Sequence, residues 1–134
     1  IFVEPEQIGD SICDMPTIYY EQFSGKKYQY FYGVSPCGID VNPGAIVKVD
    51  VDNKTSLTWS EKGCYPSEPI FVPSPNSESE DDGVILSSLV YDENENSVGL
   101  IILDAKSFKE IGRVNFQTPS PAPRTFHGWY FPNC

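Results

Sequence analysis

Short runs of apolar and β-branched residues recur along the chain, and polar, turn-rich stretches separate them. The separating stretches include "SPCGIDVNPG" (35–44), "PSPNSESEDDG" (73–83) and "YDENENS" (91–97). Helical periodicity is nearly absent, and the twelve prolines are spread along the sequence. This pattern predicts an all-β chain. We expect strands at Tyr28–Tyr32, Ala45–Val51, Ser56–Trp59, Ile70–Val72, Val84–Tyr91, Val98–Leu103 and Ile111–Phe116.

Strands of this length and spacing are typical of a sandwich, a barrel or a propeller. Segments 46–59 and 100–114 share one layout: an apolar strand that ends in an aspartate (Asp50, Asp104), a polar turn and a second strand. Their separation is close to the roughly 40–50 residues of a four-stranded propeller blade. The similarity favours two propeller blades, with two unrelated hairpins as the alternative. Because two blades cannot close a ring, we expect the chain to be a piece of a larger structure.

We divide the chain into three parts on this basis. Residues 1–27 form a leading segment from a preceding blade, residues 28–116 form roughly two blades, and residues 117–134 form a proline-rich connector with a final strand. The first residue is Ile1 and the only methionine is Met15, so we expect that upstream residues have been removed. No run approaches the roughly 18 apolar residues of a transmembrane helix.

Charge limits the classes of partner. Nine basic and nineteen acidic residues give a net charge of −10, which argues against nucleic acid or an anionic membrane surface as the main partner. With 134 residues, 40% of them hydrophobic, the chain is long enough to bury a core as one domain.

One carboxylate stands out in "YPSEPIFVPSP" (65–75). Pro69 favours an extended conformation at Glu68, and the strand-forming residues 70–72 follow. The carboxylate is therefore expected at the entry of a strand, near its buried side. Because an unpaired buried charge is costly, Glu68 requires a partner from elsewhere.

His127 is the only histidine, and it lies in the aromatic segment "FHGWYF" (126–131). The residues alone leave two interpretations, a packed or exposed histidine of an aromatic strand and a functional imidazole. The chain has no second histidine for a metal site of its own, and no Ser-His-Asp arrangement can be assigned from residue order.

Two polar segments have similarly open interpretations. The acidic run Glu78, Glu80, Asp81 and Asp82 could attract calcium, but it lacks a known loop signature, so we expect a solvated loop. The segment "TPSPAPR" (118–124) is either a docking site for a proline-reading domain or a stiff connector before the last strand.

Four cysteines, Cys13, Cys37, Cys64 and Cys134, allow three complete disulfide pairings, and their spacing does not suggest zinc. If the protein is secreted, we expect at least one bridge, with Cys37–Cys64 as the first choice. Asn53 begins the one glycosylation sequon, a triplet that chance alone would produce about once in this chain.

Several segments together resemble a known family. "YYEQFSGKKYQYFYGV" (19–34), "YPSEPIFVPSP", "EDDGVILSSLVYDE", "LIILDAKSFKEIGRV" and "FHGWYF" are similar, in this order and spacing, to the C-terminal stretch of the carotenoid cleavage oxygenases. The resemblance covers about residues 13–131. It implies a seven-bladed β-propeller with a non-haem ferrous iron on its axis, held by four histidines that glutamates orient.

The resemblance also assigns roles to residues of this chain. His127 matches the fourth iron ligand, and Glu68 matches a glutamate that hydrogen-bonds a ligating imidazole, which we expect to come from another part of the fold. Asp14, in "CDMP" (13–16), matches a position where the family usually has another such glutamate. Because aspartate is one methylene shorter, its hydrogen bond would need a shift of about 1 Å or a bridging water.

Two functions follow from the resemblance. The first is the C-terminal portion of an Fe2+ oxygenase that cleaves a double bond of a carotenoid or apocarotenoid with O2, completed by the remaining N-terminal part of the propeller. The second is a carotenoid- or retinoid-binding protein of the same fold, with little catalysis. The resemblance implies a cytoplasmic or peripherally membrane-associated protein, and the four cysteines leave secretion as the alternative. In either case the ligand is an apolar polyene.

Overall fold

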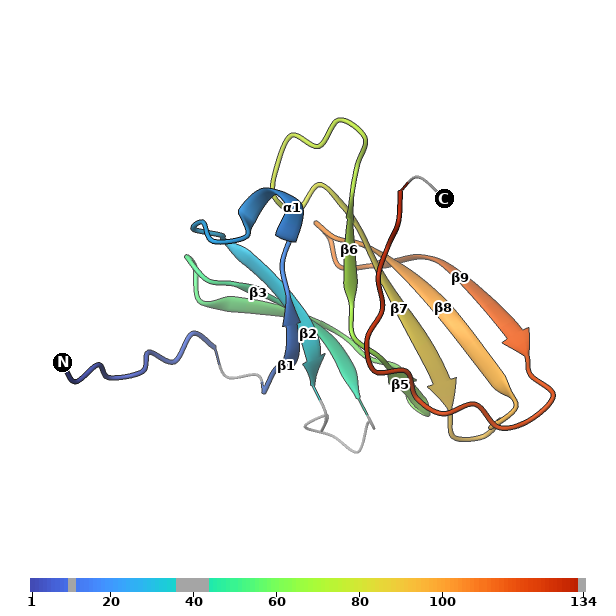
Figure 1. Ribbon diagram of the computed structural model, residues 1–134. Coiled ribbons are helices and arrows are strands. Elements are labelled where there is room, and N and C mark those ends of the chain that lie inside the picture. The colour runs from blue at the N-terminus through green and yellow to red at the C-terminus, as the bar shows by residue number, and fades with distance from the viewer. Residues whose placement is uncertain (10–11, 36–43, 133–134) are drawn as a thin grey trace.

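The computed structural model describes residues 1–9, 12–35 and 44–132, and nearly all of its regular structure is β-sheet (Figure 1). Within these ranges the only helix is the single turn α1 (Tyr20–Phe23). The strands are β1 (Asp14–Thr17), β2 (Tyr30–Ser35), β3 (Ala45–Asp50), β4 (Thr55–Trp59), β5 (Cys64–Pro66), β6 (Ile70–Pro73), β7 (Gly83–Tyr91), β8 (Ser97–Asp104) and β9 (Glu110–Gln117). The all-β prediction is confirmed, and each strand expected between residues 28 and 116 has a counterpart. The short strands β1 and β5 were not expected.

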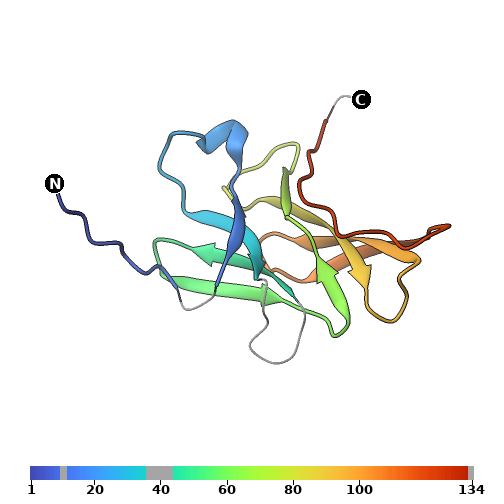
Figure 2. The same cartoon turned by 60° about the horizontal axis from the view of Figure 1, so that its bottom comes forward.

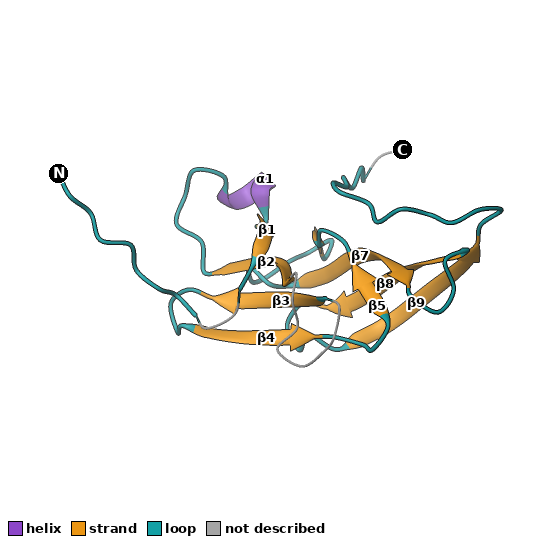
Figure 3. Cartoon of the chain, turned by 90° about the horizontal axis from the view of Figure 1, so that it is seen from below, coloured by secondary structure: helices purple, strands orange, loops and turns teal. Residues whose placement is uncertain are grey.

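The strands form two antiparallel sheets, which Figures 2 and 3 show from two further directions. The first sheet has the order β1-β2-β3-β4. The second has the order β5-β7-β8-β9, and β6 also pairs with β7. Neighbouring strands in the sheet are mostly neighbours in the sequence, which is the meander arrangement of propeller blades.

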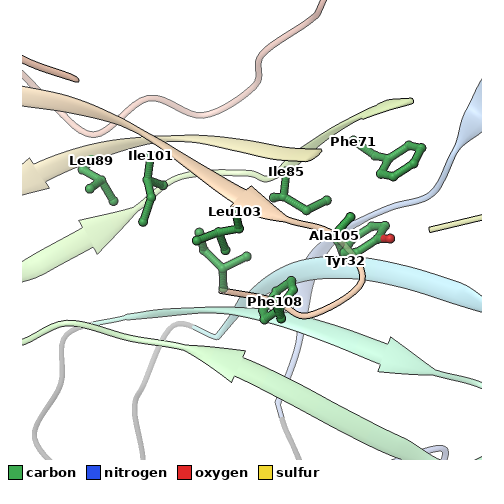
Figure 4. Packing of buried hydrophobic residues seen from close by; sticks show 9 residues of the cluster. Tyr32, Phe71, Ile85, Leu89, Ile101, Leu103, Ala105 and Phe108 are labelled. Carbon is green, nitrogen blue, oxygen red and sulfur yellow. The ribbon is translucent and has the colours of Figure 1, made fainter. Parts of the chain in front are cut away.

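The main core lies between the two sheets (Figure 4). Strands β7 and β8 alternate between buried and half-buried positions, so one face of the second sheet is covered throughout. Tyr32 of the first sheet stacks on Phe71 of the second, with ring centroids 5.7 Å apart and an interplanar angle of 6°. Phe108 adds a second ring to Tyr32 from the β8–β9 turn. The cluster comprises Tyr32, Ile46, Phe71, Ile85, Leu89, Ile101, Leu103, Ala105 and Phe108.

A buried ion pair also joins the sheets. Lys48 of β3 places its Nζ 2.8 Å from Oδ2 of Asp81, and the same Nζ donates to the carbonyl oxygen of Ala105 at 2.7 Å. The ammonium group also lies 4.3 Å from the ring centroid of Tyr30. Asp81 precedes β7 and Ala105 follows β8, so one cation of the first sheet fixes two loops of the second.

The acidic run at 78–82 is therefore not the solvated loop that we expected. Both carboxylate oxygens of Glu80 accept a hydrogen bond from the backbone N–H of Gln29, and Oε1 also accepts one from that of Tyr30. Asp81 is only 9% exposed because it pairs with Lys48. Through these two carboxylates, the loop before β7 contacts the start of β2 and the middle of β3.

The opposite face of the second sheet is apolar and incompletely covered. Val114 and Phe116 on β9 are 45% and 54% exposed, and they pair with Leu100 and Val98 of β8, which are half-buried. An apolar face of this kind normally packs against further protein.

Replacing Lys48 with methionine should strongly destabilise the fold. The substitution keeps most of the side-chain volume but leaves the Asp81 carboxylate and the Ala105 carbonyl without their cation, and breaking a buried pair in this way costs about 3–5 kcal/mol. Denaturant unfolding would measure the loss. Lys27→Met is the matched control, because the Lys27–Asp52 pair is exposed and its removal should cost less than about 1 kcal/mol. Equal unfolding midpoints for the two variants would contradict this role of Lys48.

Candidate metal centre

Glu68 lies in a break between two short strands that share one edge of β7. Strand β5 pairs with residues 89–91 of β7 and ends at Pro66, whereas β6 pairs with residues 83–86 and begins at Ile70. Neither Pro66 nor Pro69 has an N–H for a continuous ladder. Ser67 alone bridges the break, because its N–H donates to Ser88 and its carbonyl accepts from the Ser87 hydroxyl. Glu68 is thus held on a fixed backbone without being part of a strand.

The segment that carries His127 runs alongside this break (Figure 1). We expected it to be a final strand, but residues 118–132 pair with no strand in the described part of the chain. A strand requires a partner with free hydrogen-bonding groups, and the edge next to this segment is interrupted by the two prolines. We call residues 118–132 the C-terminal tail.

Glu68 and His127 are hydrogen-bonded to each other. The distance from His127 Nδ1 to Glu68 Oε2 is 3.0 Å, and the backbone N–H of Gly128 approaches the same oxygen at 3.4 Å. The Glu68 side chain is 18% exposed, and the His127 side chain is 69% exposed. The partner required by Glu68 is therefore His127 of the same chain, not an imidazole from another part of the fold as we expected.

This contact determines which ring nitrogen is available for a ligand. A carboxylate next to Nδ1 favours the tautomer in which Nδ1 carries the proton and donates it to Glu68. The lone pair then lies on Nε2, on the side of the ring away from Glu68. Metal-binding histidines use this arrangement, because the carboxylate fixes the ring and raises the basicity of the ligating nitrogen.

Asp14 lies on the same side of the molecule as the tail but does not contact His127. Its Oδ1 accepts the backbone N–H of Met15 at 2.8 Å, within an irregular β1–β2 pairing where Met15 has a φ of 50°. It lines a cavity of about 140 Å³ together with Met15, Val34, Arg124, Thr125 and Phe126. The structure therefore brings Asp14 to the tail residues that precede His127.

One imidazole does not make a metal site by itself. Among residues 1–9, 12–35 and 44–132, no three or more His, Cys, Asp or Glu side chains gather where they could hold a metal ion. Any metal on His127 would need further ligands from outside this part of the chain.

The cysteines do not support the Cys37–Cys64 bridge. Cys13 and Cys64 are free thiols, and Cys37 and Cys134 lie outside the described residues. The Cys64 thiol is buried and donates to Glu61 Oε1 at 3.3 Å. Burial and the hydrogen bond with Glu61 raise the pKa of Cys64 to about 12.

Asn53, the candidate for glycosylation, lies in the exposed β3–β4 turn, where its Nδ2 donates to Asp50 Oδ2 at 2.8 Å. None of the helices in the described ranges has the length and apolar composition required to cross a membrane.

Comparisons with known proteins agree with the resemblance found in the sequence. The family model described as "RPE65: Retinal pigment epithelial membrane protein" matches residues 3–132. The chain is 54% identical to the carotenoid isomerooxygenase of Drosophila melanogaster over 135 residues, which is 100% of this chain and 22% of that protein. It is 48% identical to the mitochondrial carotenoid-cleaving dioxygenase of Homo sapiens over 120 residues, covering 89% of this chain and 20% of that protein.

Solved structures show the same fold. A Synechocystis apocarotenoid oxygenase mutant superposes with a TM-score of 0.80 at 27% identity, over 95% of this chain and 27% of that chain. The cobalt-substituted form of the Synechocystis enzyme has a TM-score of 0.76 at 27% identity, over 92% and 26%. The expected fold, part of a β-propeller, is confirmed, and the chain spans about a quarter of the length of these proteins.

The Cys64 thiol should be unreactive in the folded protein. The thiolate is the reactive form, and a pKa of about 12 leaves very little of it at neutral pH. Treatment with iodoacetamide at pH 7.5, followed by peptide mass spectrometry, should label Cys64 only after denaturation. Labelling of the native protein at the rate of a free peptide thiol would contradict the burial of this side chain.

Proposed function

The chain belongs to the family of RPE65 and the carotenoid oxygenases, and on this premise we propose that it is the C-terminal portion of a non-haem iron(II) oxygenase. The complete enzyme cleaves a double bond of a carotenoid or apocarotenoid with O2. The hydrogen bond between Glu68 and His127 carries the proposal, because it leaves Nε2 of the only histidine free to be a metal ligand.

Each of these two residues has a defined task in the proposed centre. His127 supplies one neutral nitrogen ligand, and Glu68 holds the proton on Nδ1 so that the ring keeps one tautomer and one orientation. The bound iron supplies the activation of O2. Three further histidines are expected from the rest of the protein.

Asp14 is proposed to orient one of those further histidines. Asp14 lines the cavity next to tail residues Arg124 and Phe126, and an imidazole from a preceding blade would reach it there. One of its oxygens already accepts the Met15 N–H, so the other is the one available for an imidazole N–H.

The exposed apolar residues of the chain are suited to contact a polyene and the remaining blades of the propeller. Phe126, Trp129 and Phe131 are each at least 65% exposed, and the Phe126 ring stands edge-on to the His127 ring at 4.8 Å. In the complete propeller these rings would exclude water from the metal and contact an apolar polyene. The open face of β8 and β9 would pack against the remaining blades.

We propose a cytoplasmic or peripherally membrane-associated protein. The free thiols of Cys13 and Cys64 fit a reducing compartment, where disulfides are rare. Secretion is the alternative, and it would require bridges that involve Cys37 or Cys134.

Replacing His127 with alanine in the complete protein should abolish iron retention and cleavage, because a ligand is lost. Glu68→Gln should retain iron but bind it about 10–100-fold more weakly, because a neutral amide oxygen accepts the Nδ1–H hydrogen bond more weakly than a carboxylate does. Metal analysis measures the iron retained by the His127 variant, and chelator competition measures the iron affinity of the Glu68 variant. Glu78→Gln is the control, since this exposed carboxylate lies in the loop between β6 and β7 and should leave iron affinity unchanged.

The same measurement decides between enzyme and carrier. The oxygenase requires iron in the purified parent protein and its loss in the His127 variant. A parent protein that binds a polyene but retains no iron would contradict the oxygenase and would support the carotenoid- or retinoid-binding alternative.

A further inference from the structure

The tail that carries His127 has no strand ladder to fix its register. An extended chain advances about 3.3 Å per residue, so a slip of one residue would carry the imidazole out of hydrogen-bonding reach of Glu68. Other contacts must therefore hold the tail in place.

Two side chains just before His127 make such contacts. Arg124 donates through Nη2 to the carbonyl oxygen of Pro66 at 2.5 Å, and the Thr125 hydroxyl lies 2.6 Å from that of Ser88. In the sequence, Arg124 stands out only as the end of a proline-rich connector. Its role depends on a carbonyl 58 residues away in the sequence, which no local pattern indicates.

The acceptor of Arg124 lies on the same rigid backbone that carries Glu68. Pro66 and Pro69 are fully buried, and the residue next to Pro66 is hydrogen-bonded to β7 through both its N–H and its carbonyl. Arg124 contacts Pro66, and His127 contacts Glu68. The tail therefore runs in the same direction as residues 66–68 and is hydrogen-bonded to them at two positions.

A close approach of the backbone at Gly128 completes the arrangement. A Cβ atom at Gly128 would lie 2.7 Å from Cδ1 of Ile70, so the tail rests directly on β6 just beyond His127. His127 is thus placed between the Arg124 contact on one side and the Ile70 contact on the other.

We propose that Arg124 is a positioning residue for His127: its guanidinium group anchors the tail to the Pro66 carbonyl and so keeps the imidazole on Glu68. Arginine suits this task because it stays charged and directs several donors from one rigid plane. The effect on iron rests on the proposed function, whereas the effect on the register of the tail does not.

The test uses the complete protein with Arg124→Met, which keeps much of the apolar stem but removes the donors. In the metal-free protein, hydrogen exchange of the peptide containing residues 125–131 should become at least about tenfold faster, because the tail is no longer anchored. After loading, iron affinity measured by chelator competition should fall about 10–100-fold, as when other supporting contacts of ligands are lost. Arg124→Lys should recover part of both effects, because it keeps one charged donor.

Arg113→Met is the matched control. Arg113 is the other arginine of the chain, and it pairs with Glu61 and Glu110, so its loss should lower stability without changing tail exchange or iron affinity. Thr125→Val, which removes the contact with Ser88, should change tail exchange in the same direction as Arg124→Met.

The outcomes separate the two proposals. Tail exchange and iron affinity equal to those of the parent in a folded Arg124→Met protein would overturn the role of Arg124. A parent protein without iron would contradict the proposed oxygenase, and tail exchange in the metal-free protein would still decide whether Arg124 sets the register.

Discussion

The hydrogen bond between Glu68 and His127 depends on a break in the ladder along one edge of β7. Pro66 and Pro69 cannot donate to β7, so β5 ends and β6 begins around them. Ser67 is still hydrogen-bonded to β7, because its N–H donates to the Ser88 carbonyl and its carbonyl accepts from the Ser87 hydroxyl. These two bonds keep the break rigid. The partly buried Glu68 carboxylate is therefore held in a fixed position next to the C-terminal tail, which is not a strand. This is a suitable place to orient an imidazole from a segment without secondary structure.

The rigidity of this edge comes from the core beneath it. Ile85 and Leu89 of β7 are fully buried against the first sheet, and the Lys48–Asp81 pair joins the two sheets nearby. The order of dependence runs from the packing of the sheets to the position of β7, then to Ser67 and Glu68, and finally to the ring of His127. The ring itself is 69% exposed in this chain, which agrees with a centre completed by other protein.

The sequence was sufficient for much of the fold. Runs of apolar and β-branched residues predicted β7 and β8 almost to their ends, because both strands are apolar over most of their length. It also indicated that Glu68 needed a partner. It did not identify that partner, because 59 residues separate Glu68 from His127 and the tail has no periodic pattern that would place it.

Two further expectations, a solvated acidic run and a final strand, were wrong because contacts between residues distant in the sequence decide both. The acidic run was expected to be solvated, but the partners of Glu80 and Asp81 lie at least 33 residues away and only the packing of the sheets brings them together. The final strand was expected from the aromatic residues around His127. Aromatic composition favours a strand only where a partner strand is available, and the broken edge next to the tail offers none.

The role of His127 as a metal ligand is tested most directly by a crystal structure of the complete protein with anomalous data collected above and below the iron absorption edge. An anomalous peak is expected within bonding distance of Nε2 of His127, with Glu68 hydrogen-bonded to Nδ1 of the same ring. A metal bound to Nδ1, or a His127 ring turned away from a metal that the other ligands hold, would contradict this role of His127.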